Sequence, residues 1–458
     1  MTNDQAKPID KQDQQVIGQI EEFLAELIRQ MPPDEAEMAR EGPGRPRVVP
    51  SMCLWAGLLT CVVRGFSSQL DLWRLLSDGN FWFYPRFAIS DQAVYKRLQQ
   101  EGTQPLQRLF RQVQTVLAPR LAPYQEKELA PFAVQVLALD ETTLDQVARL
   151  LPALRGEPKG SKLLLPGKLA ALFNVRSQQW ERVQHLEDPH QNSKVAARSM
   201  LDQVPEESLV LIDLGYFGFE LFDWLTQQRL WWISRMREGT SYEVIHTFFE
   251  STDEAGNIEV FDGVVWLGAY RADRAAYAAR LVQFRMGKAQ YRYITSVLDP
   301  AKLTIAQIAR LYARRWDIEL AFKLVKRYLG LHILWSAKGV VVQQQVWAVL
   351  IISQILQGLR LEIAGKAEVD PYEVDPYEVS MELLVRYLPR YAYTGEDPVQ
   401  VFVERGRELG FIRSSTRTNI RAPIIDPKEL VPIPDDLVLL RPARYAHRKC
   451  APRPVLRN

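Results

Sequence analysis

The stretch LYARRWDIELAFKLVKRYLGL, residues 311–331, carries the most informative pattern in this chain. Four of its polar residues follow the spacing Y-x2-R-x3-E-x6-K: Tyr312, Arg315, Glu319 and Lys326. At about 100° per residue, these positions fall within an arc of about 60° on a helical wheel. The positions beside this arc are apolar and predict a stripe that faces the core: Leu311, Ile318, Phe322 and Val325. One helix face therefore places a carboxylate, two cations and a phenol at the edge of a core.

Two interpretations of this face are open. A carboxylate on a rigid element, beside an Arg and a Lys, suits a metal ligand next to phosphate-binding cations. The same residues also fit an ordinary amphipathic helix in which Arg315 and Glu319 form an i, i+4 ion pair. Trp316 lies at the edge of the face and can either stack on a base or fill the core, and we favour the core. Further acidic residues upstream decide between a metal site and a plain helix.

Two upstream segments each carry an aspartate at the end of a short apolar run. Residues 132–144, FAVQVLALDETTL, predict a buried strand that ends in Asp140. Residues 208–217, SLVLIDLGYF, predict a second strand that ends in Asp213, before a turn at Gly215. A carboxylate at a strand terminus can point into a cleft, where a cation reaches it. Each aspartate alone also fits a cap at a strand–helix junction, but the pair in this order favours a shared site.

These motifs together resemble the DDE transposases of bacterial insertion sequences, the cut-and-paste enzymes of the insertion-sequence-4 group. The resemblance covers about residues 45–363. It implies that the catalytic and metal-binding residues are Asp140, Asp213 and Glu319. It also implies that the phosphates near the cut are held by Tyr312, Arg315 and Lys326. Leu214 departs from the pattern, because relatives often have a basic residue directly after the second aspartate, and this puts one DNA contact in doubt.

Phosphoryl chemistry explains the need for three carboxylates. Two Mg²⁺ ions about 4 Å apart can activate the attacking oxygen and stabilise the leaving one, and Mn²⁺ can substitute for them. Hard cations of this kind take oxygen ligands from Asp and Glu. The chain has five His and three Cys, without the paired spacing of a zinc site. A sparse, odd cysteine count fits a reducing cytosol.

Composition adds loose limits on location and partners. The net charge of +2 over 458 residues does not by itself indicate nucleic acid. The N-terminus is polar and predicts no secretory signal, and the apolar runs near residues 52–63 and 346–356 are too short to span a bilayer. We therefore expect a cytoplasmic bacterial protein without membrane contact, associated with the nucleoid when it acts. The basic tail, residues 441–458, is either a solvated end or a DNA-gripping arm.

We expect a mixed α/β fold of four regions. Residues 1–48 form an N-terminal helix and linker, 49–128 a helical DNA-binding domain, 129–345 a ribonuclease-H-like DDE catalytic domain, and 346–458 a C-terminal helical region with the basic tail. From residue 132 the chain reads as three strands, a helix, a strand, a helix and a strand, the order that the resemblance implies. About residues 237–300 predict a β-rich insertion in the catalytic domain, whose aromatic residues can stack on an extruded base.

A second candidate for DNA contact lies upstream, in AISDQAVYKRLQQ, residues 88–100. This segment predicts a short helix with Ser90 or Asp91 as its N-cap. It resembles a recognition helix, whose polar N-terminal residues meet base edges. The residues placed for such contacts are Gln92, Tyr95, Lys96 and Arg97. An ordinary surface helix is the alternative.

The expected function is that of a transposase, which binds the inverted repeats at transposon ends and catalyses Mg²⁺-dependent cleavage and strand transfer into target DNA. Since two ends must be cut together, a homodimer on paired DNA ends is implied. One alternative is a ribonuclease-H-fold nuclease that cuts DNA without inserting anything. Another is an inactive transposase relative kept as a DNA-binding protein, although three intact acids argue against it. The pentapeptide EVDPY occurs twice in residues 368–377 and indicates a small tandem duplication in a loop.

Overall fold

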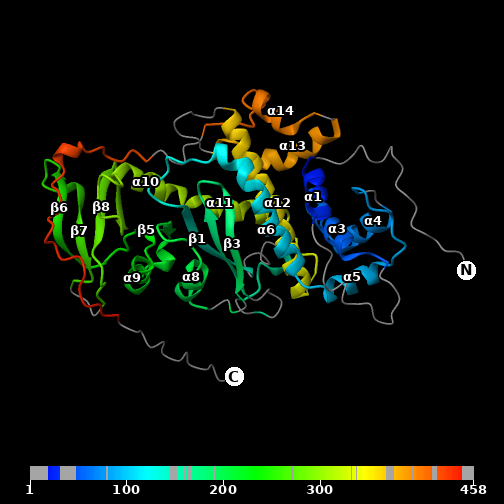
Figure 1. Ribbon diagram of the computed structural model, residues 1–458, viewed down its shortest axis with the longest axis horizontal. Coiled ribbons are helices and arrows are strands. Elements are labelled where there is room, and N and C mark those ends of the chain that lie inside the picture. The colour runs from blue at the N-terminus through cyan, green and yellow to red at the C-terminus, as the bar shows by residue number, and fades with distance from the viewer. Residues whose placement is uncertain are drawn as a thin grey trace, which may run out of the picture.

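The computed structural model places helices at one end of an elongated molecule and a large sheet at the other (Figure 1). It describes residues 19–30, 48–78, 81–144, 152–158, 161, 167–186, 188, 191–269, 273–331, 333–336, 338–367, 376–394, 396–414 and 420–445. The described ranges leave out residues 31–47 of the predicted N-terminal helix and linker, the first EVDPY copy and the basic tail beyond Tyr445.

The sheet has nine strands in the order β3-β2-β1-β4-β5-β9-β8-β7-β6. Its strands are β1 (Val136–Thr143), β2 (Lys168–Asn174), β3 (Gln179–Leu186), β4 (Leu209–Ile212), β5 (Trp231–Arg235), β6 (Tyr242–Thr252), β7 (Ile258–Leu267), β8 (Ala279–Met286) and β9 (Ala289–Thr295). Two helices, α8 (Ser193–Leu201) and α9 (Phe219–Gln227), connect β3 to β4 and β4 to β5. The predicted mixed α/β class and the ribonuclease-H-like order of β1 to β5 are therefore confirmed.

Parallel pairing of β1 with β4 brings the two predicted aspartates to the same level of the sheet. The paired segments of the two strands, Val136–Leu139 and Leu209–Ile212, are buried apolar runs, as expected for parallel strands covered on both faces. Their last paired residues are Leu139 and Ile212, so Asp140 and Asp213 follow the ends of the same ladder. The structure differs from the prediction in one detail. Asp140 does not end its strand, because β1 continues to Thr143 along its antiparallel partner β2.

The β-rich region expected near residues 237–300 extends the same sheet, because β9 pairs antiparallel with β5. A tight hairpin joins β6 to β7, where the Asp253 carboxylate accepts hydrogen bonds from the backbone N–H groups of Ala255 and Asn257. Gly256 in this turn has φ +78°, a left-handed conformation that glycine adopts without steric cost. The insertion thus continues the catalytic sheet as an antiparallel extension.

The remaining helices form one layered core around α12 (Gly339–Lys366). The N-terminal set consists of α1 (Gln19–Gln30), α3 (Ser51–Val63), α4 (Gln69–Ser77), α5 (Asp91–Gln100) and α6 (Gln104–Leu121). Beyond α12, α13 (Met381–Thr394) and α14 (Pro398–Arg405) cover its far end. By length and composition α12 could cross a membrane, but 78% of its most apolar window is buried inside the protein. It is the shared core helix that joins the N-terminal helices to the sheet.

The C-terminal strap, residues 420–445, returns from α14 across the outer strands of the sheet (Figure 1). Its backbone pairs with the sheet region through Val431 N–H to the Phe248 carbonyl and Ala278 N–H to the Leu439 carbonyl. The Arg441 guanidinium lies 4.5 Å from the centre of the Trp266 ring and donates to the Leu267 carbonyl at 2.7 Å. The strap has no apolar periodicity, so the sequence did not indicate it.

A buried aspartate anchors the end of the strap. Asp223 on α9 is 2% exposed. Its carboxylate accepts hydrogen bonds from the N–H groups of Ala276 (2.7 Å) and Tyr277 (3.0 Å) and from the Tyr445 hydroxyl (2.6 Å). Burial raises the pKa of Tyr445, and the hydrogen bond to Asp223 raises it further. The Asp223 carboxylate therefore ties two distant chain segments to α9.

We predict that Asp223→Ala lowers the free energy of unfolding by about 3 kcal/mol, because it leaves three donors without an acceptor. Tyr445→Phe removes one donor only and should cost about 1 kcal/mol. Urea denaturation gives the free energies, and hydrogen exchange of residues 274–278 and 439–444 reports release of the strap. Equal effects of the two substitutions would contradict the anchoring role of Asp223.

Candidate active site

The signature segment folds as an irregular helical rod. α10 (Ile305–Arg314) begins with a capping box, in which Thr304 and Gln307 satisfy each other's backbone N–H groups. α11 (Trp316–Lys323) follows after a break at Arg315, and a π-helical turn spans Leu324–Tyr328. The predicted stripe is confirmed, since Leu311, Ile318, Phe322 and Val325 are all buried. The helical-wheel prediction treated residues 311–331 as one regular helix, and this regularity was wrong.

The three predicted acids come from three elements and surround one arginine. Asp140 lies on β1, Asp213 follows β4, and Glu319 lies on α11, which packs against β1 and β2. The Arg315 Nη2 atom donates to Glu319 Oε1 at 2.7 Å, and its Nε atom lies 3.8 Å from Asp213 Oδ1. The structure therefore brings Asp140, Asp213, Glu319 and Arg315 together at one edge of the sheet.

The Asp140 carboxyl group has a raised pKa. Its pKa is raised to about 6, chiefly by burial and to a smaller extent by the nearby Glu319 and Asp213 carboxylates. The Glu141 backbone N–H, which donates to Asp140 Oδ1 at 2.8 Å, and the Arg315 guanidinium act in the opposite direction. The cost of burying the charged carboxylate therefore outweighs the stabilisation that the Glu141 N–H and Arg315 give to it.

The donor chemistry of this group fits a divalent cation. Carboxylate oxygens are the ligands that hard cations prefer, and the guanidinium of Arg315 already stands as a cation between two of the acids. Among the residues that the structure describes, no three His, Cys, Asp or Glu side chains are arranged as a preformed metal cage. A cation at this place would therefore draw the carboxylates closer together, with Arg315 moving aside.

Tyr312 and Lys326 flank the same group. Tyr312 is 5% exposed, and its ring packs against Tyr293 with ring centres 5.2 Å apart. Burial raises the pKa of Tyr312 to about 12, so its hydroxyl stays protonated. Lys326 lies in the π-helical turn, where burial lowers the pKa of its ammonium and the nearby Asp140 charge raises it. Tyr312 thus forms a platform under Arg315, and Lys326 faces the Asp140 side.

Trp316 is 52% exposed, so the favoured prediction of a core residue was wrong. Its ring lies 5.2 Å from the Arg315 guanidinium. Trp316 is exposed because the next two residues, Asp317 and Ile318, are fully buried and occupy the inward positions at this turn of the helix. The indole is left on the surface beside the acids.

The second candidate for DNA contact, α5, begins as predicted, with the Ser90 hydroxyl accepting from the Ala93 N–H at its N-cap. Gln92 and Lys96 are exposed and Tyr95 is half-buried. Arg97 is engaged elsewhere, since its guanidinium pairs with Glu101 and donates to the Ser51 hydroxyl at 2.6 Å. The α5 residues predicted to contact DNA are not part of the group formed by Asp140, Asp213 and Glu319. Of these α5 residues, Gln92 and Lys96 lie on the exposed side of the helix.

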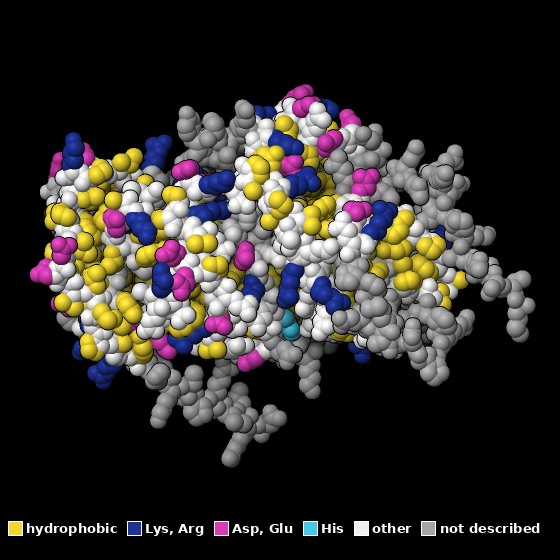
Figure 2. Space-filling view, in the orientation of Figure 1, with side chains coloured by type: hydrophobic (Ala, Val, Ile, Leu, Met, Phe, Trp, Pro, Cys, Tyr) yellow, Lys and Arg dark blue, Asp and Glu magenta, His cyan; other side chains and the backbone are white. Residues whose placement is uncertain are grey.

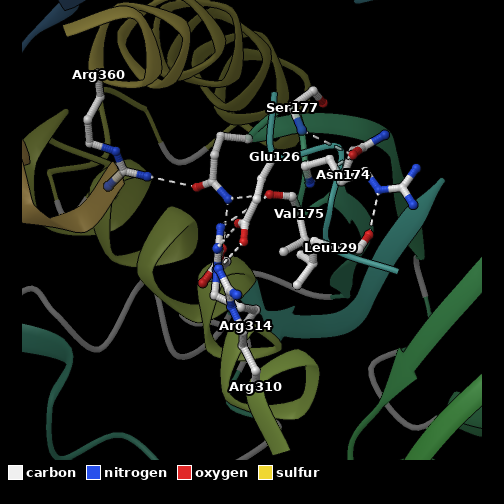
Figure 3. Close-up of polar contacts among 11 residues, drawn as sticks. Glu126, Leu129, Asn174, Val175, Ser177, Arg310, Arg314 and Arg360 are labelled. Atoms are coloured by element: carbon white, nitrogen blue, oxygen red, sulfur yellow. Dashed lines mark hydrogen bonds and ion pairs between the residues drawn. The ribbon is translucent and has the colours of Figure 1, made fainter. Parts of the chain in front are cut away.

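A buried ionic network that the sequence did not reveal lies behind the acids (Figure 3). Arg314 donates to Asp317 Oδ2 at 2.9 Å, and both Arg310 and Arg314 pair with Glu126, which precedes β1. Asp317 is fully buried and Arg314 is 2% exposed. Because these residues alternate with Arg315 and Glu319 along the chain, the network fixes how the rod is rotated against the sheet.

Two further elements join this network. Gln178, in the turn between β2 and β3, donates from Nε2 to Asp317 Oδ2 at 2.7 Å and accepts from Arg360 on α12 at 3.0 Å. The Arg360 guanidinium lies 3.7 Å from the centre of the Tyr377 ring, and the Tyr377 hydroxyl donates to the Asp317 carbonyl. The second EVDPY copy thus ends on the network. The only signal in the sequence was the position of Arg314 and Asp317 within the signature.

The opposite face of β1 carries a smaller polar cluster beside Asp140. Lys168 Nζ and Ser193 Oγ donate to Glu141 Oε1 at 2.9 and 2.7 Å. Glu141 Oε2 and the Tyr216 hydroxyl are buried, and neither makes a hydrogen bond of ordinary geometry. Burial, followed by the Glu141 charge, raises the pKa of Tyr216. This cluster joins β1, β2 and α8 directly behind the first acid.

Comparison with known proteins agrees with this geometry. Residues 135–355 match the family described as the transposase DDE domain. The resemblance to DDE transposases of bacterial insertion sequences is therefore confirmed, and this part of the chain carries their domain.

The curated relatives are distant. The chain is 25% identical to the transposase InsG for insertion sequence element IS4 of Escherichia coli strain K12, over 37% of this chain and 38% of the relative. It is also 25% identical to the probable transposase for insertion sequence element IS5377 of Geobacillus stearothermophilus, over 34% of this chain and 41% of the relative. The matches span about two fifths of the length of these relatives.

Among solved structures, the chain is similar to the piggyBac transposase in a synaptic complex with hairpin DNA. The similarity covers 93% of this chain and 90% of that one, with a TM-score of 0.39 and 10% sequence identity.

We predict that Asp317→Ala lowers the free energy of unfolding by about 3–5 kcal/mol, because it removes one partner from a buried ion pair. A matched control is Glu382→Ala, which breaks the exposed i, i+4 pair with Arg386 and should cost less than about 1 kcal/mol. Urea denaturation of the full chain measures both. Similar small losses would show that the network contributes little to the fold.

Proposed function

We propose that this protein is a metal-dependent transposase that cuts DNA at the ends of an insertion sequence and joins the freed ends to target DNA. The observation that carries the proposal is the meeting of Asp140, Asp213 and Glu319 around Arg315, within a transposase DDE domain. A charge-rich edge of this kind suits phosphoryl transfer, in which the protein mainly positions groups and stabilises charge.

Asp140, Asp213 and Glu319 are the residues that would hold the cations. Two divalent ions, Mg²⁺ by preference with Mn²⁺ able to replace it, would supply an activated oxygen nucleophile and stabilise the leaving oxygen. The position of Asp140 beside the Glu319 and Asp213 carboxylates, in a site that disfavours its charge when no cation is bound, supports this assignment. The smaller cluster around Glu141 keeps the first acid in place from the opposite face of β1.

Arg315 is the residue that would respond first to DNA. In the protein alone its guanidinium is shared between Glu319 and Asp213, and its Nε atom is buried without a hydrogen bond. A phosphodiester at this edge competes for the guanidinium, since arginine binds phosphate in the same forked geometry as carboxylate. Transfer of Arg315 to phosphate then releases two carboxylates. Lys326 supplies a second cation on the Asp140 side.

The other assignments are carried into the proposal from the sequence. The region 49–128 would read transposon ends through the exposed face of α5, and residues 129–345 would perform catalysis. Exposed Trp316 would stack on a base near the cut, with Tyr312 supporting Arg315 from below. Cleavage of two ends together calls for a homodimer on paired DNA, acting on the nucleoid in the bacterial cytoplasm. Residues 346–458 complete the core through α12.

A nuclease of the same fold is the second candidate function. It shares the acids, the cations and the DNA substrate, and it differs only in lacking strand transfer. Linear DNA that contains the gene and its flanking sequence distinguishes the two. Excision with joining of the ends to a second DNA supports the transposase, whereas cutting without joining supports the nuclease.

We predict that Asp140→Asn, Asp213→Asn and Glu319→Gln each lower the rate of cleavage by about 10³-fold or more, as expected when a catalytic group is removed. Binding of the same DNA without metal should change by less than about threefold. Glu220→Gln, an exposed acid paired with Arg198 on the neighbouring helix, is the control and should cleave normally. Substantial metal-dependent cleavage by any one of the three variants would remove that residue from the site.

We also predict that Arg315→Ala and Lys326→Ala weaken binding to element-end DNA and flatten its salt dependence. Each lost phosphate contact should reduce the slope of log K against log salt by about 0.9 on duplex DNA. Fluorescence anisotropy across a salt series measures the slope. An unchanged slope with a lower unfolding temperature would mean that Arg315 serves only as the partner of Glu319.

A further inference from the structure

A groove of about 850 Å³ runs along the free edge of β3. Its walls come from α6 and α12 on one side of the strand and from α8 on the other. We call it the β3 groove and define it by five lining residues: Arg111, Arg182, Gln184, Gln343 and Trp347. Figure 2 shows a row of Lys and Arg side chains crossing this face of the molecule near β3 and the lower end of α6. None of the residues discussed for catalysis lines it.

The strand register ties this groove to the acids. Asp140 pairs with Ala171 on β2, and Ala171 pairs with Val183 on β3, which lines the groove. Since neighbouring strands lie about 4.8 Å apart, the groove begins roughly 10 Å from Asp140 on the same row of the sheet. A DNA strand carries one phosphate about every 3.4 Å along the helix axis. A strand bound at the acids would therefore reach the groove within about three nucleotides.

The lining charge is positive. Arg111 is exposed on α6 and forms no ion pair with any residue in the described part of the chain. Arg182 is held in place by the carbonyl groups of Ser199 and Met200 at the end of α8. Glu181 is the one acid in the described lining, so the two arginines leave an excess of positive charge. The groove therefore attracts an anionic partner.

The uncharged lining suits nucleotides. Each of the five glutamines in the groove uses one amide atom in a hydrogen bond within the protein, which leaves the other atom to donate to or accept from a base edge: Gln107, Gln114, Gln184, Gln203 and Gln343. Trp347 is half-buried and is held edge-on to Phe110, with ring centres 5.5 Å apart. A fixed aromatic ring in a basic groove is a common platform for stacking bases of a single strand.

An added peptide strand fits this edge poorly. The Gln114 amide already donates to the carbonyls of Trp180 and Glu181, and Gln354 accepts from the Trp180 N–H at 2.9 Å. Part of the backbone that β-augmentation would use is therefore occupied. The lining charge also repels the chain's own basic tail, residues 446–458, which holds Arg and Lys and no acid.

We infer that the β3 groove binds a strand of the DNA substrate a few nucleotides from the cut, with Arg111 on phosphate and Trp347 against a base. This inference rests on the proposed function for its substrate, and it adds a contact surface on the opposite side of Asp140 from the β-rich extension.

The test measures binding of a labelled 30-nucleotide single strand of mixed sequence, and of its duplex, to the full chain without metal. Arg111→Glu should weaken single-strand binding by about fivefold or more and reduce the salt slope by at least about 0.7. Arg405→Glu, the same charge change at an exposed site on α14, should leave both unchanged. Thermal unfolding confirms that each variant is folded.

Trp347→Ala should weaken single-strand binding by about tenfold, as expected for one lost stacking contact. In a strand with 5-iodouracil, light-induced cross-links should map to the peptide that contains Trp347. If the wild type binds and cleaves DNA, and Arg111→Glu and Arg405→Glu have the same single-strand affinity and salt slope, the groove inference alone is overturned. Absence of both binding and cleavage in the wild type would overturn the proposed function as well. Displacement of the strand by decaglutamate at equal charge would reassign the groove to acidic peptides.

Discussion

The buried ion pair between Arg314 and Asp317 is the constraint on which the candidate site depends. Two charges taken out of water are tolerated only when the surrounding groups satisfy them, and here Glu126 and Gln178 complete the set. These partners come from the segment before β1 and the turn after β2. The helical rod can therefore meet the sheet in one rotation only. That rotation turns Arg315 toward Asp213, so the geometry of the acids follows from a network that does not touch them.

The same constraint explains where sequence patterns succeed and where they fail. The apolar stripe through Ile318 and Phe322 is a periodic signal, and it was predictable because each position contributes independently to burial. The exposure of Trp316 was not predictable in this way. A hydrophobicity pattern assigns tryptophan to the core and aspartate to the surface, whereas the buried partners of Asp317 reverse the two. Such an exchange depends on residues more than a hundred positions away, which no local pattern contains.

In the sheet, too, local features were predictable from the sequence and contacts between distant segments were not. The strands and the positions of Asp140 and Asp213 were predictable, because buried parallel strands are short apolar runs with polar residues where the ladder ends. The pairing of β9 with β5 depends on a contact between distant segments, and so does the strap. The strap gains its place through backbone hydrogen bonds and the Asp223 anchor, which leave no periodic trace in the sequence. The π-helical turn at Lys326 likewise has no periodic pattern in the sequence that predicts it.

The balance of charges around the acids couples the proposed binding of DNA to the proposed binding of metal. Arg315 compensates Glu319 and Asp213 in the protein alone, and Asp140 is left with a raised pKa. In the proposed function, DNA would add phosphate charge to the same edge and would draw Arg315 away from the carboxylates. Both changes would increase the need for further positive charge at Asp140, which divalent cations would meet. DNA and metal would therefore favour each other's binding, and the site would be assembled for phosphoryl transfer only when both are present.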